Sequence, residues 1–97
     1  MPAKWWQVWR TRARPTASET RVVVYTRANC PLCDKAAAFL EKEQSKLHFT
    51  LEYVDIAGDA ELTKTHGSWI PVVEVDGRVR FRGSIPPVLW NRLMRER

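Results

Sequence analysis

Apolar and polar positions follow two periods along the first half of the chain. Residues 21–27 contain an unbroken apolar run, Val22 to Tyr25, which is typical of a central strand buried on both faces. Residues 48–54 alternate between apolar and polar positions and predict a half-buried strand, with Phe49, Leu51 and Tyr53 on one side. Between these strands the apolar positions recur at helical spacing, and the pattern predicts a helix from residue 32 to residue 46 that buries Leu32, Ala36, Phe39 and Leu40.

The second half of the chain contains shorter elements with clear stop signals. Residues 59–66 predict a short helix that starts near Asp59 and ends before Gly67. Strands follow at 72–75 and 78–82, and Asp76-Gly77 between them is a strong signal for a two-residue hairpin. A final helix begins after the turn at Gly83-Ser84, and we expect it to bury Ile85, Leu89 and Leu93.

This order of elements, β-α-β-α-β-β-α, predicts an α/β fold. The first strand, helix and strand favour a parallel pair with a right-handed crossover. The hairpin adds an antiparallel pair, so we expect one mixed sheet of four strands with helices on both faces. The length of 97 residues suits a single domain, which we place at residues 21–97.

Residues 1–20 form a basic, tryptophan-rich arm, which we expect to be flexible. Of the net charge of +5, residues 1–18 contribute +4, so the rest of the chain is nearly neutral. Trp5, Trp6 and Trp9 lie among basic residues, a composition that suits weak contact with a membrane surface or an anionic partner. We favour the simpler interpretation of a mobile tail over the body, because so short a segment makes only marginal helix in water.

The sequence also indicates the cellular compartment in which the protein works. No stretch is long and apolar enough to span a bilayer, and the N-terminus lacks the apolar region of a secretory signal. We therefore expect a cytoplasmic protein. Thiols stay reduced in that compartment, so a pair of cysteines is more often catalytic than structural there.

The candidate chemistry lies in Cys30-Pro31-Leu32-Cys33, at the junction of the first strand and the first helix. Unpaired N–H groups and a partial positive charge at a helix N-terminus favour a thiolate. Two intervening residues let the second sulfur reach the first. We interpret Cys30 as the attacking thiol and Cys33 as the resolving thiol, and we expect the carboxylate of Asp34 to raise the pKa of Cys33.

The main alternative for a C-x-x-C pair is half of a zinc site. Zinc normally takes four ligands, and this chain has two cysteines, with His48 and His66 far from zinc-finger spacing. We therefore predict no metal ligands, and we interpret His66 as a helix-end residue. Arg78, Arg80 and Arg82 could contact phosphate, but we interpret them as a solvated face that protects an edge strand.

The motifs together resemble those of the glutaredoxin-like family, and most closely the small bacterial glutaredoxin-like proteins with a C-x-L-C-D motif. The resemblance covers residues 21–96 and rests on four segments: Cys30 to Asp34, Val54-Asp55-Ile56, Ile70-Pro71-Val72 and Asp76-Gly77. It implies a thioredoxin-like fold.

The resemblance also implies roles for individual residues. Cys30 and Cys33 would be catalytic, and Arg27 would favour the thiolate and attract a glutathione carboxylate. Pro71 would be a cis-proline that exposes the backbone of Ile70 to an extended substrate. Leu32, Gly83 and Ser84 would complete the substrate or glutathione site. Leu32 stands where a tyrosine is commoner, Ser84 replaces a second glycine, and the acidic pair that receives the glutathione amino group is absent.

The function expected from these features is that of a thiol–disulfide oxidoreductase. It would act on a protein disulfide or a glutathione mixed disulfide, in electron transport and cell redox homeostasis. We expect a monomer with no bound cofactor and no nucleic-acid partner. The reductant would be glutathione, as a co-substrate, or a flavoprotein resembling thioredoxin reductase.

Three other functions stay open on the sequence. The first is an iron–sulfur or metal carrier that uses Cys30 from each of two protomers together with external thiols. The second is a non-catalytic binding module that receives a partner in the groove near Trp69 and Pro71. The third is association with a membrane or a nucleic acid through the arm.

Overall fold

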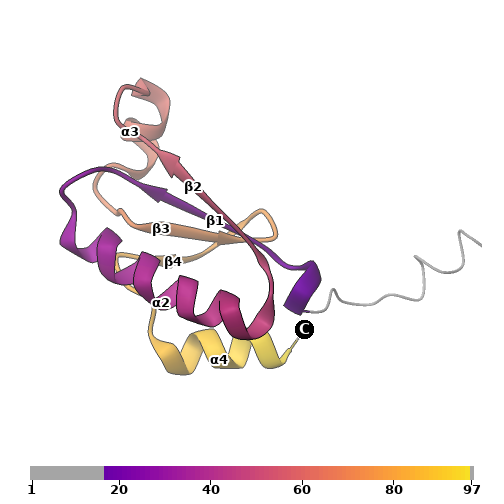
Figure 1. Cartoon of the computed structure of the whole chain (residues 1–97). Helices are drawn as coiled ribbons and strands as arrows, with labels where there is room; N and C mark the ends of the chain where they lie inside the picture. The colour runs from indigo at the N-terminus through magenta and orange to yellow at the C-terminus, as the bar shows by residue number, and fades with distance from the viewer. Residues whose placement is uncertain (1–16, 97) are drawn as a thin grey trace, which may run out of the picture.

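In a computed structural model of the chain, residues 17–96 are described, and they form three α-helices around one sheet (Figure 1). A 3-10 turn, η1, precedes the first strand. The elements are η1 (Ala17–Glu19), β1 (Arg21–Thr26), α2 (Pro31–Leu47), β2 (Thr50–Asp55), α3 (Ala60–His66), β3 (Val72–Val75), β4 (Arg78–Arg82) and α4 (Pro87–Arg95).

The sheet has the strand order β2-β1-β3-β4. β1 is parallel to β2 and antiparallel to β3, and β3 is antiparallel to β4. The central position of β1 explains its unbroken apolar run, because Val22 and Val24 are fully buried on one face and Val23 is 9% exposed on the other. The mixed four-stranded sheet predicted from the sequence is therefore confirmed.

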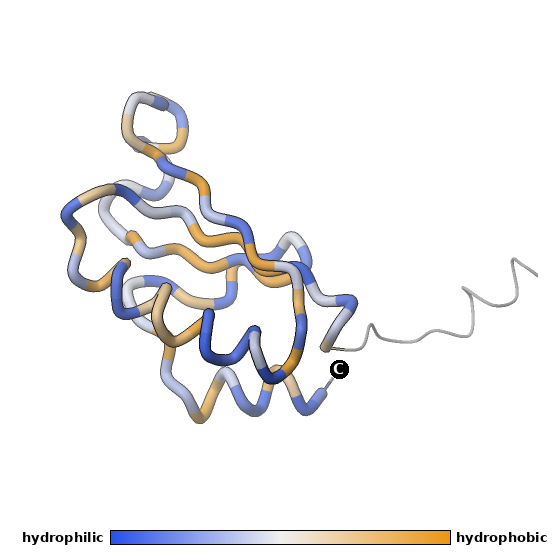
Figure 2. The backbone as a smooth tube through the Cα atoms, viewed as in Figure 1, coloured by the Kyte–Doolittle hydropathy of each residue, from blue (hydrophilic) through white to orange (hydrophobic). Residues whose placement is uncertain are grey.

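The main core lies between the sheet and the helices α2 and α4, which run along the same face (Figure 1). Figure 2 shows apolar positions concentrated on the strands, where β1 and β3 supply four valines to this core. The largest buried side chain is Trp90 of α4. Its ring packs edge-on against those of Phe39 and Phe49, at centroid distances of 6.0 and 5.5 Å.

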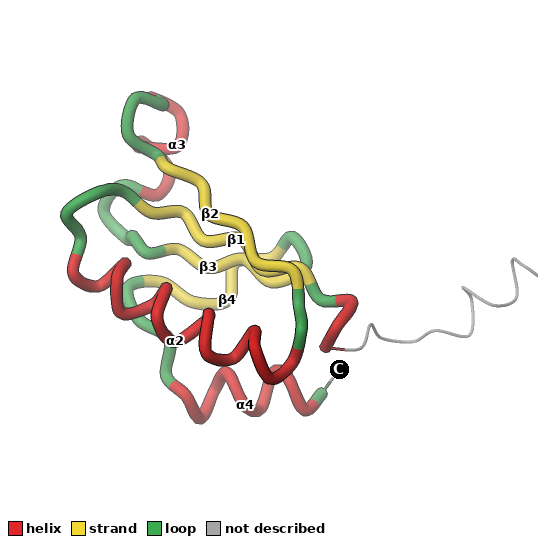
Figure 3. The backbone as a smooth tube through the Cα atoms, viewed as in Figure 1, coloured by secondary structure: helices red, strands yellow, loops and turns green. Residues whose placement is uncertain are grey.

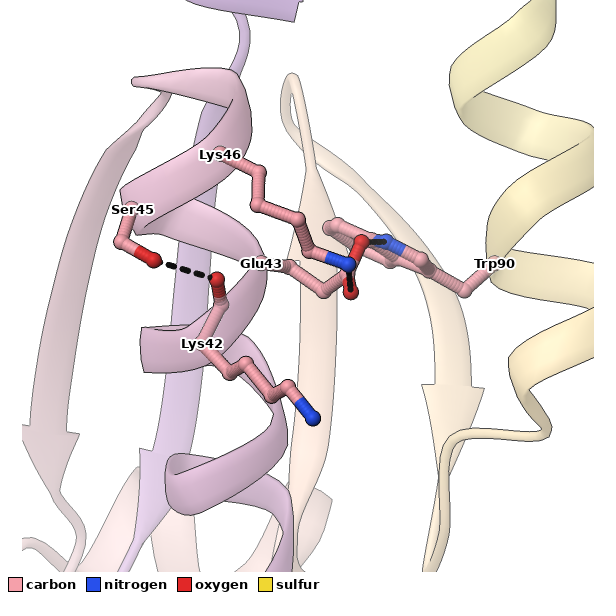
Figure 4. A network of polar contacts seen from close by, with 5 residues as sticks. All are labelled: Lys42, Glu43, Ser45, Lys46 and Trp90. Atoms are coloured by element: carbon pink, nitrogen blue, oxygen red, sulfur yellow. Dashed lines mark hydrogen bonds and ion pairs between the residues drawn. The ribbon is translucent and has the colours of Figure 1, made fainter.

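A polar clamp joins the two helices inside this core (Figure 4). The indole Nε1–H of Trp90 donates to the carboxylate of Glu43 at 3.0 Å, and Lys46 Nζ lies 2.9 Å from the same carboxylate. Burial would raise the pKa of Glu43, but the bonds from Lys46 and Trp90 outweigh it and hold the pKa below its ordinary value. The buried charge is thus paired.

The short helix α3 lies away from α2 and α4, at the end of the sheet where β2 finishes (Figure 1). His66 of α3 stacks on Tyr25 of β1, with ring centroids 4.5 Å apart. Tyr25 follows Val24 in the strand, so it faces away from the main core. Helices therefore contact both faces of the sheet, as predicted.

The element boundaries differ from the predicted ones mainly near prolines and caps. α4 begins at Pro87 because a residue that precedes a proline disfavours helical geometry, which excludes both Ile85 and Pro86. Within α4 the buried residues are Trp90 and Leu93, whereas Leu89, which we expected inside, is 47% exposed. That expectation was wrong because the register of the helix turns Trp90 inward. The expected burial of Leu32 was wrong as well, since this residue lies in the first turn of α2 and is 49% exposed.

The start of β2 also differs. His48, predicted to open the strand, is the left-handed C-cap of α2 with φ 63°, and β2 begins at Thr50. Phe49 is buried, and the hydroxyl of Tyr53 donates to Glu41 of α2 at 2.6 Å. The apolar residues therefore face α2 as predicted, but the expected burial is only partial, because Tyr53 is 44% exposed at the surface where its hydroxyl meets Glu41.

Most of the predicted arm lies outside the described residues, including its tryptophans. At its end, Thr20 is fully buried and its carbonyl accepts from the N–H of Thr50 at 3.0 Å. Within residues 17–96, every helix is too short or too polar to cross a membrane.

Candidate active site

Three loops meet at one end of the sheet (Figure 3): β1 to α2, α3 to β3, and β4 to α4. The N–H of Gly83, just after β4, donates to the carbonyl of Pro71 at 2.8 Å and to that of Trp69 at 3.1 Å. These two bonds fix the third loop against the second. Segments that are distant in sequence thus supply one site.

Cys30 is the N-cap of α2. Its backbone is extended, with φ −119° and ψ 103°, and its carbonyl accepts the first helical bond from Asp34 at 3.0 Å. The Sγ of Cys30 accepts the backbone N–H of Cys33 at 3.2 Å, so the sulfur takes the place of a capping oxygen. The side chain of Cys30 is half-buried, and both cysteines are free thiols.

Cys33 lies one turn inside the helix and is buried, with 3% of its surface exposed. Burial raises the pKa of the Cys33 thiol, and a hydrogen bond with Cys30 raises it further. Contacts with Thr26 and the backbone of Arg27 oppose the shift without cancelling it. The direction agrees with our prediction, but burial and Cys30, rather than Asp34, are its causes.

The peptide bond between Ile70 and Pro71 is cis, as the resemblance implied. Pro71 is fully buried, whereas the neighbouring Trp69 is 58% exposed. An exposed indole beside a buried proline gives this loop a large apolar face toward solvent.

A groove of about 180 Å³ runs beside the cysteine motif, between α2 and the loop after β4. It brings together three predicted site residues, Leu32, Gly83 and Ser84. The sequence reading missed the other lining residues, although helical spacing from Leu32 indicates most of them. These are Lys35, Ala36, Phe39 and Ile85.

Charge in the groove comes from one lining residue, Lys35, and no lining residue is acidic. Arg27 is exposed in the loop before Cys30 and does not line the groove. The site end of the molecule therefore offers cations and apolar surface to a ligand. A ligand amino group finds no carboxylate among the lining residues.

Within residues 17–96, no three side chains of the His, Cys, Asp and Glu types lie close enough to hold a metal ion. His48 caps α2 through its backbone N–H and is exposed, whereas the ring of His66 stacks on Tyr25.

The fold and the position of the cysteine pair define the class of protein, which is a thioredoxin-fold domain. Thioredoxin from Fasciola hepatica is similar at 17% identity with a TM-score of 0.54, covering 81% of this chain and 81% of that chain. Oxidised thioredoxin from Plasmodium falciparum is similar at 16% identity with a TM-score of 0.55, covering 99% of this chain and 91% of that one. These likenesses establish the fold.

Within that class, the model of the glutaredoxin-like domain (DUF836) matches residues 21–93, so the chain belongs to the glutaredoxin-like domain family. Protein Ne2328 from Nitrosomonas europaea is similar at 26% identity with a TM-score of 0.68, covering 77% of this chain and 91% of that one. No curated protein matches the chain.

Proposed function

We propose that the protein is a thiol–disulfide oxidoreductase in which Cys30 and Cys33 exchange electrons with a substrate disulfide. The observation that carries the proposal is the 3.2 Å contact from the Cys33 N–H to the Cys30 sulfur. A hydrogen-bond donor aimed at the sulfur of a half-buried cysteine at a helix N-terminus stabilises negative charge on that sulfur. The attacking group in disulfide exchange is a thiolate, so this geometry favours Cys30 as the nucleophile.

The first step forms a mixed disulfide. The Cys30 thiolate attacks one sulfur of the substrate disulfide, a new S–S bond forms, and the other substrate sulfur leaves as a thiolate. In the second step Cys33 loses its proton, and its sulfur attacks the Cys30 sulfur and releases the second substrate thiolate. The substrate gains two electrons, and the protein is left with a Cys30–Cys33 disulfide.

Burial of Cys33 separates the two roles. Since the pKa of Cys33 is raised, it stays a neutral thiol while Cys30 reacts, and it is shielded from competing substrates. Formation of the mixed disulfide makes the Cys30 sulfur itself the electrophile, only one helical turn from Cys33. The resolving attack is then intramolecular.

The reductant is a separate question. Arg27 and Lys35 offer cations to the carboxylates of glutathione, but the groove lining lacks an acid for its amino group. Leu32 and Trp69, at 49% and 58% exposure, offer apolar surface to a protein. These features favour a protein substrate and a flavoprotein reductase over glutathione.

The test compares two coupled assays of disulfide reduction, one with glutathione and glutathione reductase and one with thioredoxin reductase. We expect turnover in the second assay and little in the first. Cys30→Ser abolishes turnover, whereas Cys33→Ser stops after one attack and accumulates the mixed disulfide, which mass spectrometry detects. Turnover that survives Cys30→Ser, or its absence with both reductants and a broad set of protein disulfides, contradicts the proposal.

A further inference from the structure

The basic charge of this molecule is concentrated at β4 and α4. Residues 77–95 contain five arginines and no acidic residue, whereas residues 15–76 contain ten acidic and six basic side chains. All five arginines are exposed, and none forms an ion pair within the described part of the chain. They are Arg78, Arg80, Arg82, Arg92 and Arg95.

Two of these arginines line a hollow that is separate from the cysteine site. It has a volume of about 370 Å³ and lies between β4 and α4. Its apolar lining comes from Val79 and Phe81 of the strand and from Leu89 and Leu93 of the helix. Arg80 and Arg92 line it as well, together with one acidic residue, Glu96, which follows α4. Leu89 is 47% exposed, so apolar surface is open beside the charges.

β4 is also the last strand of the described sheet, since it pairs with β3 on one side only. An edge strand presents backbone N–H and C=O groups that can pair with an added strand. Like charges on the three strand arginines oppose pairing with a second copy of β4. An acidic strand would meet the opposite sign of charge at the same positions.

We propose that the β4–α4 face binds an extended acidic polypeptide segment that adds alongside β4. Side chains of an extended chain point to opposite sides in turn. Acidic positions of the partner pair with the arginines, and apolar positions enter the hollow. Main-chain bonds to the strand edge supply affinity that does not depend on the partner sequence.

A nucleic acid fits this face less well. Proteins that bind single strands stack bases on exposed aromatic rings. The aromatic residues of β4 and α4 are Phe81 and Trp90, and they are 7% and 0% exposed. The charges favour an anion, and the lack of an exposed ring on these two elements favours a peptide.

The experiment titrates the full-length chain into a fluorescein-labelled peptide of alternating Glu and Val that is long enough to span β4, and follows fluorescence anisotropy. We expect binding that weakens steeply with added salt. A peptide with Gln in place of Glu should bind about tenfold more weakly or worse. The double variant Arg80→Gln, Arg92→Gln should weaken binding about fivefold or more, since each exposed pair contributes modestly.

A matched variant removes the same number of positive charges elsewhere. Lys42→Gln, Lys64→Gln changes exposed positions on α2 and α3. It should leave affinity within about twofold, because the screened field of distant charges is small. A loss equal to that of the arginine variant would show a nonspecific charge effect and overturn the proposal.

Amide NMR shifts locate the bound peptide, with the largest changes expected at Arg78–Arg82. Shifts confined to other elements, or no binding of the Glu-Val peptide, would overturn the placement. Tighter binding to a single-stranded oligonucleotide or to phosphatidylserine vesicles would assign the face to another class of anion. Binding does not require the thiols, so it is independent of the redox proposal and should survive Cys30→Ser.

Discussion

Exposure distinguishes Cys30 from Cys33 more clearly than any other property of the two residues. Cys30 is half-buried and caps the helix, whereas Cys33 is 3% exposed and its pKa is raised, mainly by burial. The thiolate is the form that alkylating reagents attack. Solvent access and ionisation of the thiol therefore both favour reaction at Cys30 over reaction at Cys33.

We expect iodoacetamide at neutral pH to label Cys30 at least about tenfold faster than Cys33. Peptide mass spectrometry of timed samples measures both rates in one protein. In Cys30→Ser, labelling of Cys33 should rise only at alkaline pH. Burial holds the pKa of Cys33 above the ordinary cysteine value of 9.0, so its thiolate forms only at high pH. Equal rates at the two positions would contradict the assignment of roles.

Trp69 should report the redox state of the pair. Its indole is 58% exposed, and its carbonyl is bonded to Gly83, which lines the groove beside Leu32. We expect its emission to change when the disulfide opens. Trp90 is fully buried in the core, so replacing it would disturb folding. The reduced-minus-oxidised spectrum of the intact chain is better compared with that of Trp69→Phe, in which the difference should largely vanish.

At the scale of single residues, the sequence predicted the features that depend on local sequence patterns. The N-cap position of Cys30 follows from a strand that runs directly into a helix, and Asp59 likewise caps α3 by accepting the N–H of Leu62 at 3.0 Å. The cause of the Cys33 shift could not be predicted, because burial depends on how loops from elsewhere pack over the helix. The lysine in the groove was missed for the same reason.

At the scale of elements, the clamp between α2 and α4 is the contact that sequence patterns least indicate (Figure 4). Glu43 and Trp90 are 47 positions apart, yet they share a buried hydrogen bond. The bond joins α2, which lines one side of the groove, to α4, which directly follows the loop that lines the other side. Together with the ring contact between Phe39 and Trp90, this carboxylate helps to set the relative position of the two helices.

We expect Glu43→Ala to lower the free energy of unfolding by about 1–3 kcal/mol, because it leaves the buried indole N–H without an acceptor. Urea unfolding followed by circular dichroism measures the loss. Glu96→Gln, at the exposed end of α4, is the control and should stay within about 0.5 kcal/mol of the parent. An equally stable Glu43→Ala would show that the clamp contributes nothing.

The same carboxylate predicts a dependence on pH. Its pKa in the folded state lies below the ordinary value of 4.5, so its contribution is complete above that value and is lost as the pH falls through the folded pKa. Glu43→Gln removes this component. The stability difference between the parent and Glu43→Gln should therefore shrink as the pH is lowered below about 4.5, and a constant difference would contradict the assignment.

The strands β3 and β4 were predicted with their observed boundaries, because Pro71 and Asp76-Gly77 mark where each can begin and end. In the hairpin both turn residues have positive φ, 52° at Asp76 and 84° at Gly77, as a two-residue turn of this kind requires. The inward face of α4 was harder to predict. Helical period alone does not choose between Leu89 and the bulkier Trp90, and tertiary packing decides.

At the scale of the whole molecule, order should be greatest in the middle of the sheet. β1 pairs on both sides and three of its valines are buried, while none of the residues of α3 is buried. Amide exchange follows local opening, which is easiest where few apolar contacts are broken. We expect the amides of β1 to exchange slowest among the described residues and those of α3 to exchange faster than those of α2.

Hydrogen–deuterium exchange with NMR or mass-spectrometric detection tests this order. Protection of α3 equal to that of β1 would mean that the helix unfolds only with the whole domain.

The sequence supported the fold as a whole because each element agreed with its neighbours in length, period and turn signals. The sequence could not show that the basic residues gather on one surface, because the arginines of β4 and α4 come together only after the chain folds.

Both ends of the described chain, at η1 and at the end of α4, lie at the end of the sheet opposite the three site loops (Figure 1). A reporter or an affinity handle fused after α4 would therefore project away from the sulfur atoms. Immobilised through such a handle, the molecule would present its reactive end to whatever flows past, and a Cys33→Ser bait could retain its substrates covalently through Cys30.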